Sequence, residues 1–169
     1  MFNLFVFLLL LVCCANADVT KNTHEDKVCK TQLQTYYMYK LYEITLCRNK
    51  NVVYDEIFKS NFSIKLKYKM SSSSWWLANR SFAEIAKQNN LTNEEKKAYK
   101  NILSGFFPNV NNGDEILLEF EPSVGATFYY NNKMFDTIAD VGFAVKFANI
   151  WLSPNSTFIE TRNLLFAND

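Results

Sequence analysis

The segment Phe62-Ser63-Ile64-Lys65-Leu66-Lys67-Tyr68-Lys69-Met70 (residues 62–70) decides the fold class of this chain. Its apolar side chains alternate with a serine and three lysines, so an extended backbone places the two sets on opposite sides. Such alternation is typical of a strand whose sheet has one buried face and one face in water. The sequence therefore predicts a sheet that packs other elements against only one of its faces.

Outward from this strand, further strands come in antiparallel groups with helices between them, a pattern typical of the α+β class. A helix is predicted over 75–89, and a capping box at Thr92 and Glu95 opens a second one that ends near Ser104. The tyrosine-rich residues 33–47 indicate a strand. The remaining predicted elements are strands over 115–120, 127–130 and 133–138, a helix over 140–152, and a short last helix opened by a capping box at Thr157 and Glu160.

The N-terminus carries an apolar run over residues 1–14, which Ala15-Asn16-Ala17 follows with the small residues that a signal peptidase accepts. We therefore predict a signal peptide over 1–17, a flexible leader over 18–28, and one domain over 29–169. The run is shorter than the roughly 20 apolar residues that span a bilayer, so no permanent membrane span is expected. The protein is expected to be exported, to the periplasm or the medium. A retained membrane helix and a lipoprotein acylated at Cys13 or Cys14 are the alternatives.

Composition points to a globular domain without the charge pattern of a nucleic-acid-binding protein. The chain has 18 Lys and Arg against 17 Asp and Glu, and this near neutrality argues against a nucleic-acid partner. Aromatic residues make up 16% of the chain while Gly and Pro are scarce, so the domain is expected to bury a substantial core.

Cys29 and Cys47 are the cysteines that remain once residues 1–17 are removed. Exported proteins form disulfides, and a bridge closing a loop of this length stabilises a fold by about 3 kcal/mol. We predict this bridge, which requires the chain to fold back between the two residues. If residues 30–47 form one long strand, the sulfurs lie too far apart and both thiols stay free.

The chain lacks the residues that most catalytic sites need. His24 is the only histidine, and it lies in the predicted leader, so no Ser-His-Asp or Cys-His arrangement has a base. A metal site built on histidine and cysteine clusters fails for the same reason. Only four glycines occur in the chain, and they form no phosphate-binding loop. No metal and no cofactor are expected.

Motifs in the last third of the chain resemble those of bacterial chalcone isomerase-like proteins. They are Pro122-Ser123-Val124-Gly125, Asn131-Asn132-Lys133, Ile150-Trp151-Leu152 and Leu164-Leu165. In that family a Pro-x-x-Gly turn, an Asn-Gly-Lys hairpin, an Ile-Trp-Leu-Gly helix end and a closing Leu-Leu-Gly occur in the same order. Upstream, Lys40-Leu41-Tyr42 is similar to the family's Lys-Val-Tyr strand, so the resemblance extends over 29–166. It implies an open-faced β-sandwich, with an antiparallel sheet, helices packed on one face, and a ligand cleft between the layers.

The chain departs from the family pattern where function is concerned. Asn132, Asp136 and Ser153 stand where the family tends to have glycine, which affects loops only. Members that isomerise chalcones or hold a fatty-acid carboxylate use an arginine on a strand, and the matching position here is Gln34 or Lys30. Neither side chain offers the two-pronged grip of a guanidinium on a carboxylate or an oxyanion.

The resemblance therefore implies an exported, non-catalytic protein that binds a small apolar or amphipathic ligand such as a fatty acid. Tyr42 is the expected polar contact in the cleft, with Gln34 or Lys30 as its partner, and Trp75 and Trp76 are candidates for the cleft mouth. One alternative is a structural or interaction domain of the cell envelope with a filled core and no ligand. The other is an isomerase of the intramolecular-lyase type.

Overall fold

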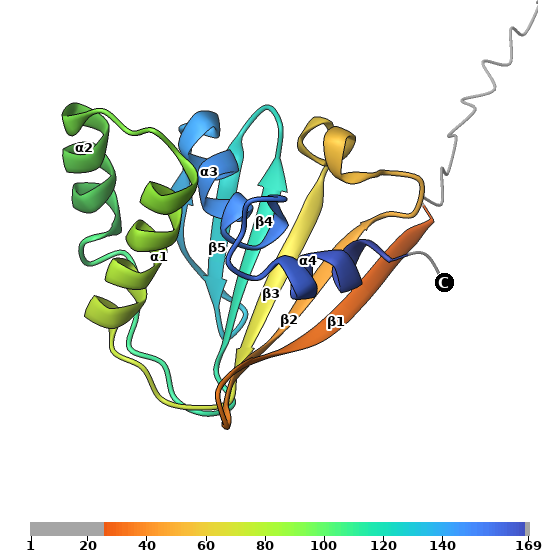
Figure 1. Cartoon of the computed structure of the whole chain (residues 1–169), viewed down its shortest axis with the longest axis horizontal. Coiled ribbons are helices and arrows are strands. Elements are labelled where there is room, and N and C mark those ends of the chain that lie inside the picture. Colours follow the sequence, from red (N-terminus) through yellow and green to blue (C-terminus); the bar gives the residue numbers. More distant parts are fainter. Residues whose placement is uncertain (1–25, 168–169) are drawn as a thin grey trace, which may run out of the picture.

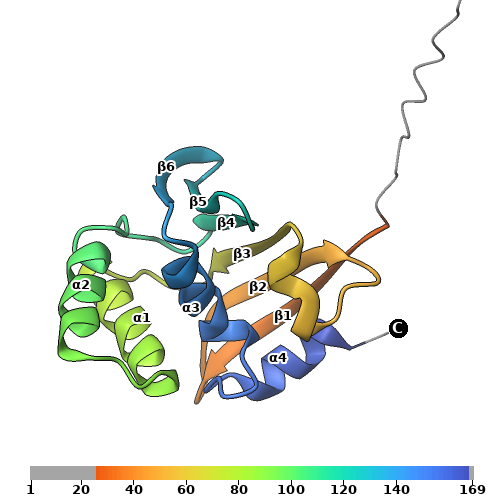
Figure 2. The same cartoon turned by 90° about the horizontal axis from the view of Figure 1, so that it is seen from above.

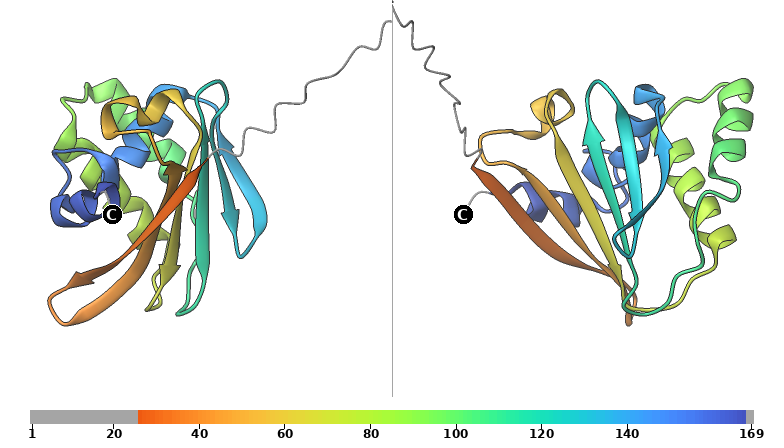
Figure 3. Two further views of the ribbon diagram at one scale, coloured as in Figure 1. Left: turned by 90° about the vertical axis from the view of Figure 1, so that its right-hand side faces the viewer. Right: turned by 180° about the vertical axis from the view of Figure 1, so that it is seen from behind.

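The computed structural model describes residues 26–167. The predicted signal peptide, its cleavage site, Cys13, Cys14 and His24 lie outside the described residues. Within them the chain forms a six-stranded antiparallel sheet, in which every strand pairs with the next one in sequence. All the helices lie on one face of this sheet, as the side view in Figure 3 shows. The predicted α+β class, with an antiparallel sheet and helices packed on one face, is confirmed.

The elements follow one another in a simple order (Figure 1). The strands are β1 (Lys27–Tyr36), β2 (Tyr39–Asn49), β3 (Phe62–Tyr68), β4 (Glu115–Glu121), β5 (Gly125–Tyr130) and β6 (Lys133–Ile138). The helices are α1 (Ser74–Gln88), α2 (Asn93–Leu103), α3 (Val141–Leu152) and α4 (Ile159–Phe166), with a short 3₁₀ helix η1 (Tyr54–Lys59) between β2 and β3. No helix in the described part of the chain is long and apolar enough to cross a membrane.

Residues 33–47 are two strands and a turn and not one long strand, so the chain folds back as the predicted bridge requires. Tyr37 takes a left-handed backbone conformation, with φ of 51°, and reverses the chain without the glycine or asparagine that usually marks such turns. The hairpin brings Cys29 directly opposite Cys47, with 4.1 Å between their Cα atoms, and a disulfide joins them on the face away from the helices. Strand β1 begins at Lys27, inside the stretch predicted as leader.

The two predicted capping boxes have different outcomes. Thr92 and Glu95 form theirs: each side chain accepts a hydrogen bond from the other residue's backbone N–H, at 3.1 and 2.9 Å. Thr157 caps nothing, because α4 begins two residues later at Ile159 and has no side-chain cap. The Thr157 hydroxyl turns instead toward helix α1 and donates to the carboxylate of Glu84.

The inward stripes of α1 and α2 are rotated from those predicted. The apolar spacing predicts Trp76, Ala83, Ile85 and Ala86 as the inward stripe of α1; Ile85 is buried, but Trp76 and Ala83 are exposed and Leu77 and Ala78 are buried. For α2 it predicts Ala98, Ile102 and Leu103, of which Leu103 is buried, together with Tyr99. For α3 the spacing predicts Val141, Ala144, Val145, Ala148 and Trp151 as the inward face, and Ala144, Ala148 and Trp151 are buried.

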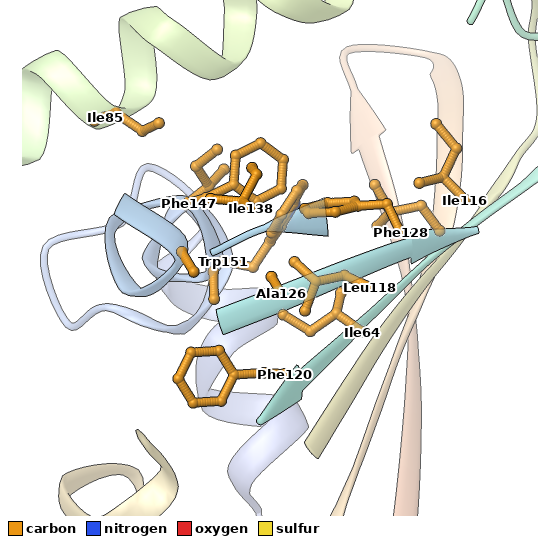
Figure 4. Close-up of a cluster of buried hydrophobic side chains, with 14 of the residues drawn as sticks. Ile64, Ile85, Ile116, Leu118, Phe120, Ala126, Phe128, Ile138, Phe147 and Trp151 are labelled. Atoms are coloured by element: carbon orange, nitrogen blue, oxygen red, sulfur yellow. The ribbon is translucent and has the colours of Figure 1, made fainter. Parts of the chain in front are cut away.

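The core fills the space between strands β3 to β6 and helices α1 and α3 (Figure 4). The strand register brings core side chains together, because Ile64 pairs with Leu118 and Leu118 pairs with Phe128 on the helix side of the sheet. The Phe128 ring packs edge-on against Phe147 of α3, with 5.4 Å between ring centroids. Gly125 begins β5 with φ of +109°, and a Cβ there would collide with the carbonyl oxygen of Ile138. Glycine is therefore required where β5 and β6 approach each other closely.

Candidate functional site: a cleft between the sheet and the helices

A cleft of about 570 Å³ separates part of the sheet from the helix layer. Strands β1 to β5 supply its floor, helices α1 and α3 supply its walls, and Thr157 and Phe158 of the segment before α4 border it. Ligand pockets for small molecules have roughly 300–1,000 Å³, so this space is sufficient for one. Figure 2, seen from above, shows α3 and α4 lying over the strands that form the floor.

The floor of the cleft is apolar because the strand alternation continues across the sheet. Register places Ile44 beside Leu66, and Leu66 beside Ile116, with every side chain on the helix face. Leu66, Ile116 and Phe128 line the cleft while remaining largely shielded from bulk water. This floor can take an apolar chain without losing any protein hydrogen bond.

Tyr42, the polar contact that the resemblance implies, lies on this floor and is hydrogen-bonded to the wall. Its hydroxyl accepts a hydrogen bond from Nε1 of Trp151, at 3.0 Å, so the hydroxyl hydrogen is available to a ligand. Burial raises the pKa of Tyr42 to about 12, partly offset by the Trp151 bond and by the nearby charge of Arg80. Tyr42 is therefore a hydrogen-bond donor throughout the neutral range.

Tyr68 pairs with Tyr42 across β2 and β3 and also lines the cleft. The two rings meet edge to face, with 6.0 Å between their centroids. Burial raises the pKa of Tyr68 as well, and the neighbouring Tyr42 adds to this shift. Two protonated phenols thus lie side by side on the floor, and both are suited to an oxygen-bearing ligand group.

Helix α1 places an ion pair in the wall, which sequence analysis missed. Nη2 of Arg80 lies 2.7 Å from Oε1 of Glu84, and the Arg80 side chain is 46% exposed while that of Glu84 is 3% exposed. Thr157 donates to the other Glu84 oxygen at 2.8 Å and accepts from Lys87 Nζ at 2.8 Å. Arg80 therefore offers a guanidinium to the cleft that a buried carboxylate holds in position.

A signal for Arg80 was present in the sequence. Trp76, Arg80 and Glu84 recur every four residues, so a helix carries all three on one side. The apolar spacing of Trp76, Ala83, Ile85 and Ala86 predicts a different inward face for this helix, one that does not include Arg80.

The predicted partners of Tyr42 differ in their position. Gln34 lies directly opposite Tyr42 and lines the cleft, where its Oε1 accepts from the Thr161 hydroxyl at 2.8 Å and its Nε2 donates to the carbonyl of Thr35. Lys30 is on the same face of β1 but opposite Leu46, and it does not line the cleft. Trp76 lines the cleft and Trp75 does not; both indoles are exposed.

Comparisons with known proteins agree with this fold. The sequence model of a family described as chalcone isomerase-like matches residues 30–160. A crystal structure of a fatty-acid binding protein from Arabidopsis thaliana is similar over 85% of this chain and 89% of that chain, with a TM-score of 0.52 and 9% sequence identity. At that identity the likeness shows the fold alone. No curated protein matches the sequence.

Proposed function

This chain belongs to the chalcone isomerase-like family, and from that premise we propose that its cleft binds one single-chain amphipathic molecule, such as a fatty acid, without catalysing a reaction on it. The observation that carries the proposal is the cleft itself: about 570 Å³ with an apolar floor and its polar groups on Tyr42, Arg80 and their neighbours. The similar Arabidopsis structure, a fatty-acid binding protein, supports the same class of ligand.

The apolar part of the ligand would lie along Leu66, Leu118 and Phe128 and be covered by α3. Each Å² of apolar surface removed from water contributes about 25 cal/mol, so a long alkyl chain supplies most of the affinity. A domain with a filled core, the structural alternative, would leave no such space between the layers.

The head of the ligand would meet Tyr42 and Arg80. A carboxylate there accepts the Tyr42 hydroxyl hydrogen and pairs with the part of the Arg80 guanidinium that Glu84 does not occupy. Arg80 thus provides, from a helix, the guanidinium that Gln34 and Lys30 lack on the strand. Because Glu84 already neutralises part of this charge, we expect modest selectivity for acids over neutral lipids.

The acid–base properties of the cleft favour binding over catalysis. A general acid or base works best with a pKa near the working pH, and the Tyr42 pKa of about 12 is far from it. The isomerase alternative predicts cyclisation of a simple chalcone, followed by absorbance, that Tyr42→Phe abolishes. We expect no rate above the uncatalysed reaction, and clear turnover would overturn the non-catalytic assignment.

We further propose that the protein acts outside the cytoplasm, in the periplasm or the medium. The disulfide between Cys29 and Cys47 supports this location, because such bonds persist in oxidising compartments. The apolar run before Ala17 supports it independently. Mass analysis of the exported protein should find Asp18 at the N-terminus; retention of residues 1–17 would contradict cleavage.

Binding is tested by filling the cleft. Ser81 of α1 lines it and Ala83 is exposed on the same helix, so Ser81→Trp fills the cleft and Ala83→Trp is its matched control. A ligand at 100 times its Kd stabilises a protein by about 2.7 kcal/mol, so palmitate should raise the melting temperature of the lipid-stripped wild type and of Ala83→Trp. Ser81→Trp should show no shift. An unshifted wild type, or equal shifts in all three proteins, would overturn the proposal.

A further inference from the structure

The five most exposed large apolar side chains in the described part of the chain belong to two short segments. Met38 is 95% exposed and Tyr37 85%, and their neighbours Tyr36 and Tyr39 complete the tip of the β1–β2 hairpin. Trp75 is 71% exposed in the first turn of α1, next to the half-exposed Trp76. We call the segments 36–39 and 75–76 the rim. Exposed apolar groups that gather, as the four at the hairpin tip do, mark interaction surfaces.

The rim borders the cleft. Tyr36 lines the cleft from the hairpin and Trp76 lines it from α1, so each segment continues a wall of the cleft into solvent. The left view in Figure 3 shows the hairpin tip extending past the helix layer. A surface that meets the rim would therefore also meet the mouth of the cleft, without any rearrangement of the core.

The residue types of the rim match a lipid–water interface. Tyrosine and tryptophan have an apolar ring and one polar group, and they gather at the headgroup level of membranes. Five of the six rim residues are of these two types. The rings of Tyr36 and Tyr37 pack edge to face on the outside of the molecule, with 4.7 Å between centroids.

The two chain segments that contain the rim carry basic charges alone, although Glu84, just beyond the second segment, pairs with Arg80. Residues 31–42 and 70–82 contain Lys40 and Arg80 but no Asp or Glu. Basic groups beside an apolar surface are attracted to anionic lipid headgroups, at about 1 kcal/mol for each one near the membrane. A symmetric pair of copies of this chain would instead bring equal positive charges together at the rim.

We propose that the rim docks the mouth of the cleft onto a lipid surface that carries anionic headgroups. Docking is a property beyond ligand binding in solution. It would let a lipid chain pass between the membrane and the cleft, and this role rests on the proposed function. The rim side chains enter the headgroup region while Lys40 remains at its surface, and the sheet and helices stay in water.

Vesicle sedimentation tests the docking. The exported protein is used after its N-terminal mass is checked, so that the apolar run over 1–14 does not contribute. Vesicles of phosphatidylcholine with phosphatidylglycerol are compared with vesicles of phosphatidylcholine alone. We expect Tyr37→Asn combined with Met38→Ser to weaken binding to the mixed vesicles roughly tenfold, and Trp75→Ser to weaken it less. Asparagine suits the left-handed backbone at Tyr37, so the hairpin is preserved.

Two further variants separate docking from nonspecific adhesion. Met134→Ser removes an exposed methionine on β6, away from the rim, and should leave vesicle binding unchanged. Lys40→Gln should weaken binding to the mixed vesicles about fivefold and leave binding to phosphatidylcholine alone unchanged. Absent wild-type binding, or equal loss in the Met134 and rim variants, would overturn the proposal. So would self-association that the rim variants abolish, because it would assign the rim to a second copy.

The test of vesicle docking can be distinguished from the test of ligand binding. Tyr37, Met38 and Trp75 do not line the cleft, so their variants should shift in melting temperature with palmitate as the wild type does. If the protein binds vesicles but palmitate does not raise its melting temperature, docking stands and the ligand proposal is wrong. If palmitate raises the melting temperature but the protein does not bind vesicles, ligand binding stands and docking is wrong.

Discussion

The two ends of the layer between sheet and helices differ in how they are filled. Where β5 and β6 meet α3, the rings of Phe128, Phe143 and Phe147 pack against one another and against Tyr99. Where β1 and β2 face the end of α3, Tyr42 and Trp151 are joined by a hydrogen bond and space remains between the layers. Phenylalanine rings close most of the first end, whereas Tyr42 and Trp151, with one polar atom each, and charged or amide side chains such as Arg80 border the open end. Stability and binding are therefore expected to depend on different residues.

The largest effect is expected at the packed end. Phe143 is fully buried between Tyr99 and Phe147, so Phe143→Ala should lower the free energy of unfolding by about 3–5 kcal/mol. Phe158→Ala at the cleft, where the ring is only partly buried, should cost clearly less. Urea denaturation of both variants checks this, and equal losses would mean that the open end is packed as tightly as the closed one.

Removal of the disulfide should affect stability without affecting binding. The bridge lies on the outer face of the sheet, so Cys29→Ser combined with Cys47→Ser should cost about 3 kcal/mol and leave palmitate affinity unchanged. The nearby pair Thr31 and Thr45, whose hydroxyl oxygens lie 2.8 Å apart, provides a control. Changing both threonines to alanine should cost under about 1 kcal/mol. A fall in palmitate affinity in the cysteine variant would show that the two faces are coupled.

Tyr42→Phe should give the reverse result, with binding affected more than stability. It removes the hydroxyl that faces the ligand head, and one hydrogen bond to a charged group contributes about 1.5–3 kcal/mol, so palmitate affinity should fall at least tenfold. The affinity for methyl palmitate, which has no charge, should fall less than the affinity for palmitate. Calorimetric titration of both ligands checks this, and an unchanged affinity for palmitate would place the carboxylate elsewhere.

A smaller effect is expected in alkali. The pKa of Tyr42 is raised from 10.0 in the unfolded chain to about 12 in the fold, so the folded state favours the neutral phenol. Its contribution to stability is complete below pH 10 and is lost as the pH rises from 10 to about 12. Tyr42→Phe should therefore flatten the loss of stability over this window in urea titrations. Identical slopes for both proteins would contradict burial of the phenol.

The sequence predicted the fold more completely than the site, for reasons that particular residues make clear. Alternation over 62–70 and the capping box at Thr92 depend on local chemistry; the structure has the capping box and the alternation up to Tyr68, where β3 ends and Met70 is exposed. The turn at Tyr37 was missed because its left-handed backbone has no glycine or asparagine to mark it. Tyr42 was predicted in the cleft by the resemblance. Arg80 was missed because its role depends on how α1 is rotated and on the distant Thr157, which holds Glu84.

The cleft is tested most directly by a crystal structure with palmitate brominated at its methyl end, in which anomalous scattering locates the bromine. We expect one bromine peak beside Phe128 and Phe147, with the carboxylate within about 3 Å of the Tyr42 oxygen and facing Arg80. A cleft without density, or a chain bound outside the space between sheet and helices, would contradict ligand binding between the layers.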